Sequence, residues 1–73
     1  MINPKILEAT LSHFRARRDE ALAVLDVYLK NPVGIGEHSN LVPEVIKWTQ
    51  VLAEAEENIS TLTRHYLTPK KKL

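Results

Sequence analysis

The chain has 73 residues, a formal net charge of +1 and no cysteine. This length allows one small domain, the missing cysteines exclude a disulfide framework or a thiolate metal site, and the balanced charge does not favour nucleic acid as a partner. No apolar run approaches the ~20 residues that span a bilayer, and Met1–Lys5 begins no signal-peptide core, so we expect a cytoplasmic protein without membrane contact.

The first predicted helix covers about residues 4–30. Asn3 is a good N-cap and Pro4 suits the first helical position, while Pro32 disfavours helix at the residue before it. Seam residues follow at alternating steps of four and three, with one charged interruption: Leu7, Leu11, Phe14, Arg18, Ala21, Leu25 and Tyr28. This a/d pattern is typical of a helix that packs along another helix.

Residues 31–40 are predicted to be a loop, because proline, two glycines, serine and two asparagines fall within them. The loop is longer than the ~2–8 residues of most helix–helix connections. Either its apolar residues seal the end of the helix pair, or it presents a surface to a partner. Four of its side chains are candidates for partner contact: Val33, Ile35, Glu37 and His38.

The second predicted helix covers about residues 41–67, with Ser39 or Asn40 as its cap. Its apolar residues keep the same alternating steps, at Leu41, Val45, Trp48, Leu52, Ala55, Ile59, Leu62 and Tyr66. Trp48 and Tyr66 are therefore expected in the core. Thr68 and Pro69 end the helix, and residues 69–73 form a short basic tail.

The two seams predict an all-α fold, a two-helix antiparallel coiled-coil hairpin over residues 1–68. In the best register Leu7 faces Leu62 and Tyr28 faces Leu41, at opposite ends. Each large aromatic side chain then faces an alanine, with Phe14 opposite Ala55 and Trp48 opposite Ala21. Pairing large with small side chains fills layers at native density, which supports this register.

One flank of the hairpin is apolar in the half nearest the loop, apart from Thr49, which is polar but small. We name this flank the loop-end stripe; its residues are Leu22, Leu29, Val42, Ile46 and Ala53. A single partner helix cannot cover these side chains, and an exposed stripe of this kind usually marks an interface. We therefore expect a homodimer in which two hairpins form a four-helix bundle, with a further, unidentified protein as a possible partner.

A positive cluster, Arg15, Arg17 and Arg18, allows two interpretations. Together with Lys70, Lys71 and Lys72 it could contact phosphate. The favoured alternative pairs the arginines with acids that the register brings alongside, Glu54, Glu56 and Glu57. Arg18 lies in the seam, where a polar residue costs stability, and its head is expected to reach Glu56 or Asp19.

No residue set in the sequence predicts catalysis, a metal or a cofactor. The three histidines, His13, His38 and His65, are not spaced for a shared ion, and a zinc site needs three or four convergent ligands. Neither Ser12 nor Ser39 has an acid placed to orient the neighbouring histidine. We therefore expect a protein that is not an enzyme.

The segment Tyr28–Asn40, with Asn-Pro-Val-Gly-Ile-Gly-Glu-His at its centre, resembles small uncharacterised proteins of tailed bacteriophages. The resemblance covers roughly residues 22–66, and only the loop motif in it is specific. It implies a phage product in the host cytoplasm and no known activity.

The sequence as a whole leaves two hypotheses about function. The first is a protein-interaction module that docks onto a larger protein, and the second is a nucleic-acid-associated protein. Only the second predicts binding that weakens steeply as the salt concentration rises.

Overall fold

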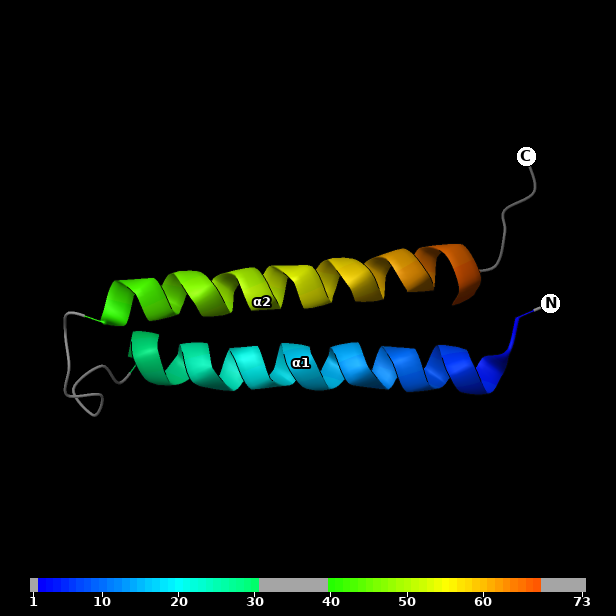
Figure 1. Cartoon of the computed structure of the whole chain (residues 1–73), viewed down its shortest axis with the longest axis horizontal. Coiled ribbons are helices and arrows are strands. Elements are labelled where there is room, and N and C mark those ends of the chain that lie inside the picture. Colours follow the sequence, from blue (N-terminus) through cyan, green and yellow to red (C-terminus); the bar gives the residue numbers. More distant parts are fainter. Residues whose placement is uncertain (1, 31–39, 68–73) are drawn as a thin grey trace.

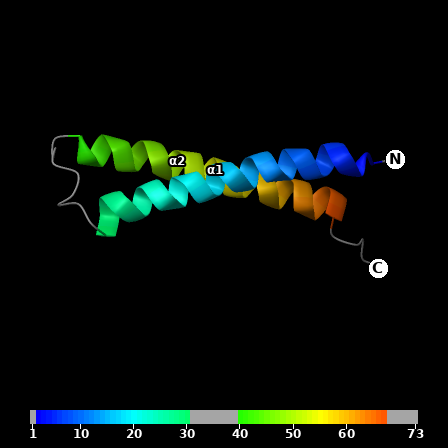
Figure 2. The same ribbon diagram turned by 90° about the horizontal axis from the view of Figure 1, so that it is seen from below.

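The computed structural model describes residues 2–30 and 40–67. Two helices, α1 (Pro4–Lys30) and α2 (Leu41–Leu62), lie side by side, and α2 continues into a π-helical segment, η2 (Thr63–Leu67). Figure 1 shows that α1 begins and η2 ends at the same end of the molecule, and Figure 2 shows the two helices crossing along their length. The predicted all-α helical hairpin is confirmed, and the described ranges contain no strand.

Local sequence explains where the helices begin. The side-chain Oδ1 of Asn3 accepts hydrogen bonds from the backbone N–H groups of Lys5 (3.0 Å) and Ile6 (3.2 Å), as an N-cap does. Asn40 occupies the corresponding place before α2, but its side chain makes no capping hydrogen bond. Its backbone is already helical (φ −99°, ψ 0°), whereas a side-chain cap requires extended geometry.

The buried face of each helix follows the predicted seam. Four described side chains are buried, Leu11, Ala21, Leu25 and Ala55, and the other seam residues are partly buried except Tyr66. Leu7 and Leu62 line one hollow at the terminal end, and Tyr28 and Leu41 line another at the loop end. Both end pairs therefore agree with the predicted register.

Tyr66 departs from the prediction, because its side chain is 53% exposed rather than in the core. It lies in η2, where π-type hydrogen bonds widen the turn. In the register that pairs Leu7 with Leu62, Tyr66 lies at the level of residues 3–4, where α1 begins. No further turn of α1 covers the ring, so Tyr66 stays exposed although it lines the terminal hollow with Leu7 and Leu62.

The core of the described hairpin is thin. Two of its four buried side chains are alanines, and Leu11 is the largest fully buried one. Domains of this size have little apolar area to offset the loss of chain entropy and usually need a metal, a disulfide or a partner. The exposed part of the hairpin is therefore relevant to how the chain is stabilised.

Candidate interaction surface

The loop-end stripe is exposed in the structure. The exposed fractions are 42% for Leu22, 63% for Leu29, 66% for Val42 and 52% for Ile46, and Ala53 is also exposed. In the observed register these residues share one flank of the hairpin, because each lies one position beyond a seam residue. Large apolar side chains that gather on one flank are a candidate contact surface.

Part of the stripe surrounds an open apolar hollow of about 220 Å³ at the loop end. Its lining brings together three stripe residues, Leu29, Val42 and Ile46, with three seam residues, Tyr28, Leu41 and Val45. Leu22 and Ala53 lie outside the hollow, farther along the same flank. The remaining predicted contact residues, Val33, Ile35, Glu37 and His38, lie outside the described residues.

The polar group of this hollow has its own partner. The Tyr28 hydroxyl donates a hydrogen bond to Glu44 Oε1 at 3.4 Å, joining α1 to α2. Burial, then the charge of Glu44 and then this hydrogen bond raise the pKa of the Tyr28 hydroxyl. A hydroxyl that stays protonated and bonded to α2 strengthens the hairpin and leaves the hollow apolar.

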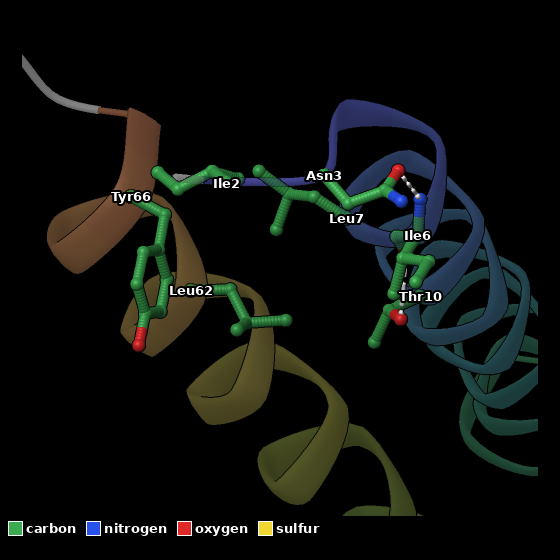
Figure 3. Close-up of a pocket in the computed structure, with 7 residues that line it drawn as sticks. All are labelled: Ile2, Asn3, Ile6, Leu7, Thr10, Leu62 and Tyr66. Atoms are coloured by element: carbon green, nitrogen blue, oxygen red, sulfur yellow. Dashed lines mark hydrogen bonds between the residues drawn. The ribbon is translucent and has the colours of Figure 1, made fainter.

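A second apolar hollow, of about 300 Å³, lies at the terminal end (Figure 3). Figure 3 shows Ile6, Leu7 and Thr10 on α1 opposite Leu62 and Tyr66, with Ile2 between the two sides. Two of its polar side chains bond to the backbone of α1, since Asn3 Oδ1 caps the helix and the Thr10 hydroxyl donates to the Ile6 carbonyl at 2.8 Å. This hollow was not predicted from the sequence, although Ile2 and Ile6, two apolar residues outside the seam, were a signal for it.

The arginine cluster is paired within α1, and the expected pairing with acids of α2 is wrong. Each arginine has its own acid, in the pairs Arg15–Glu8 (3.7 Å), Arg17–Glu20 (2.9 Å) and Arg18–Asp19 (3.0 Å). Asp19 is one of the two partners expected for Arg18. An acid on the same helix is held close by the backbone, so fewer side-chain rotamers are lost than in a pair across helices. In the described chain Glu54 and Glu56 make no ion pair, and Glu57 accepts a hydrogen bond from Thr61.

Trp48 lies between two cations on the flank opposite the loop-end stripe. The Arg17 guanidinium lies 5.5 Å from the ring centroid and the Lys47 ammonium 5.2 Å. These contacts cover the partly buried indole with charge. The positive groups of this flank thus have partners in the hairpin, which weakens the nucleic-acid interpretation; Lys70, Lys71 and Lys72 lie outside the described residues.

The remaining chemistry-bearing residues do not converge. Among residues 2–30 and 40–67, no three His, Cys, Asp or Glu side chains come together as a metal site would require. His13 lies against Phe14 and His65 against Tyr66, with ring centroids 5.1 Å and 6.3 Å apart. His38 lies outside these ranges. No helix in the described part of the chain is long and apolar enough to cross a membrane.

Comparison of the chain with protein-family models, with curated proteins and with solved structures finds no match in any of the three. The resemblance to tailed-phage proteins therefore stays a prediction. The loop-end stripe is the candidate contact surface of the described chain.

Proposed function

We propose that the chain is a non-enzymatic protein-interaction module that associates with a second copy of itself through the loop-end stripe. The observation that carries the proposal is the exposure of Leu22, Leu29, Val42 and Ile46, between 42% and 66%, on one flank of a hairpin with a thin core. Covering this flank supplies the apolar burial that the hairpin lacks. Two hairpins joined in this way make a four-helix bundle.

The proposed module has a second contact region, the segment 31–40. This segment is longer than a connection needs and would dock onto a larger protein through Val33, Ile35, Glu37 and His38; the resemblance to phage proteins would place that docking in the host cytoplasm. The stripe is the part that the described residues support.

The test is sedimentation equilibrium on the wild type and on Ile46→Glu. Burying the exposed half of each Ile46 contributes ~1 kcal/mol to the free energy of association. A carboxylate buried there without a partner costs a few kcal/mol more. We therefore expect the dimer dissociation constant to rise about a hundredfold or more. Circular dichroism on dilution should show loss of helix together with dissociation.

The matched control is Val27→Glu. Val27 is 49% exposed, close to the 52% of Ile46, but it lies on the flank away from the loop-end stripe. We expect Val27→Glu to remain a dimer with the wild-type dissociation constant. A wild type that is a folded monomer at high micromolar concentration would contradict the proposal, and so would equal disruption by both substitutions.

A further inference from the structure

One acidic side chain beside the loop-end stripe has no partner in the hairpin. Glu56 is exposed on the same flank, just beyond Ala53, and makes no ion pair with another described residue. Arg15 lies on this flank of α1 with its side chain 42% exposed, and its one acid, Glu8, is 3.7 Å away. Toward the termini this flank therefore carries Arg15 with its acid Glu8 on α1, and the unpaired Glu56 on α2.

The observed register fixes the position of each residue along the long axis of the hairpin, which we call its height. Leu7 lies beside Leu62 and Tyr28 beside Leu41, so the two helices advance in step from one end to the other. Counting from these pairs, Leu22 lies at the height of Ile46, Leu29 at that of Val42, and Arg15 at that of Glu56. Each match holds to within two residues, or ~3 Å at ~1.5 Å per residue.

A second copy can cover the stripe in two ways that keep two-fold symmetry. In the first, both loop ends lie at the same end of the bundle, and α1 of each copy packs on α2 of the other. Residues of equal height then meet: Leu22 contacts Ile46 of the second copy and Leu29 contacts its Val42. In the second, the loop ends lie at opposite ends, Leu22 meets Leu22, and Leu29 meets Arg15.

Charge and size favour the first arrangement. It places Arg15 of one copy against the unpaired Glu56 of the other, twice in each dimer, and the remaining contacts along this flank are apolar apart from the small Thr49. The second arrangement places the most exposed stripe residue of α1, Leu29, against a cation. A charged group buried against an apolar side chain costs free energy, whereas opposite charges that meet at an interface fix its orientation.

We propose, building on the self-association above, that the two hairpins dock with their loop ends together and that Arg15 of each copy pairs with Glu56 of the other. Glu56 is then a residue that specifies the orientation of the dimer. The apolar stripe supplies the affinity, and the two ion pairs exclude the reversed orientation.

Cysteine cross-linking distinguishes the two orientations, since the chain has no cysteine of its own. Leu29→Cys and Val42→Cys are made as separate proteins, unfolded together, refolded and oxidised. We expect a disulfide-linked species that joins residue 29 of one chain to residue 42 of the other, identified by mass spectrometry. The comparison protein is Leu22→Cys alone, which we expect to remain uncross-linked because the two copies of residue 22 lie diagonally apart.

A charge exchange provides the independent readout. Arg15→Glu and Glu56→Arg should each weaken the dimer about tenfold or more, because each loses two ion pairs and gains two repulsions. An equal mixture of the two variants should recover the wild-type dissociation constant, because the mixed dimer again has two ion pairs, one with the wild-type sign and one with the reversed sign.

The outcomes separate the two proposals. Efficient cross-linking of Leu22→Cys to itself, or no recovery in the charge-exchange mixture, would overturn the proposed orientation while self-association stands. A wild type that sediments as a folded monomer would overturn the self-association as well.

Discussion

Replacing Arg18 with leucine should stabilise the protein, because Arg18 interrupts an otherwise apolar seam. Its side chain is 34% exposed, and its guanidinium reaches Asp19 on its own helix at 3.0 Å rather than a group on α2. The hollow beside it, about 390 Å³, is lined by Arg18 with Glu56, Ile59, Ser60 and Thr63. A leucine would place branched apolar volume in the seam, where the arginine contributes only its stem.

The magnitude follows from burial. Full burial of a leucine side chain is worth ~1.5–3 kcal/mol, and a position about two-thirds covered realises ~1–2 kcal/mol of it. The loss of an exposed ion pair subtracts ~0–1 kcal/mol, so we expect a net gain of about 1 kcal/mol. For a domain of this size the midpoint of thermal unfolding should rise by ~4–8 °C.

The assay is thermal unfolding followed by circular dichroism at one fixed protein concentration. The control is Arg17→Leu, since Arg17 also has an acid on its own helix, at 2.9 Å, but lies outside the seam and over Trp48. Arg17→Leu should leave the midpoint unchanged or lower it slightly, because it loses the ring contact. A lower midpoint for Arg18→Leu than for the wild type would refute the reasoning and show that the guanidinium belongs to a network the hairpin needs.

Two further predictions concern the helix start and the contact between helices. Asn3→Ala should lower the free energy of unfolding by ~1 kcal/mol in urea titrations, because it removes a side-chain cap. The control is Asn40→Ala, which removes no such hydrogen bond and should leave the free energy of unfolding nearly unchanged. Equal losses in the two variants would contradict the cap assignment. The raised pKa of Tyr28 predicts a contribution to stability that is complete below its unfolded pKa of ~10 and is lost as pH rises through the higher folded value. Tyr28→Phe should flatten that alkaline fall in unfolding titrations across pH 9–11, and an unchanged fall would refute this linkage.

The seam was predictable from sequence, because burial along a regular helix depends only on backbone periodicity. Leu11, Leu25 and Ala55 are buried where the alternating steps place them. The exposure of Leu29 and Val42 followed from the same periodicity, since one partner helix covers only a narrow stripe.

The features that the sequence did not predict depend on which of several conformations of similar free energy a side chain or a helix end adopts. Arg15 was expected to pair with an acid of α2 but pairs with Glu8, on its own helix. Tyr66 is exposed because α1 begins at Pro4, at the level of Tyr66, and the regular sequence steps do not show where the cover of the neighbouring helix ends. The missing side-chain cap of Asn40 is likewise a matter of local backbone angles, which residue type only biases.

Folding and association are coupled in a hairpin of this kind. Leu11 and Leu25 are the only large side chains buried in the described chain, so much of the apolar surface that could offset chain entropy lies in the loop-end stripe. If the stripe is covered only by a second copy, the measured free energy of unfolding contains an association term that grows with protein concentration.

Substitutions in the seam, such as Arg18→Leu, then change stability at every concentration, because they act within one chain. Substitutions in the stripe, such as Ile46→Glu, change how stability depends on concentration, and that difference separates a structural residue from an interface residue without any knowledge of the partner.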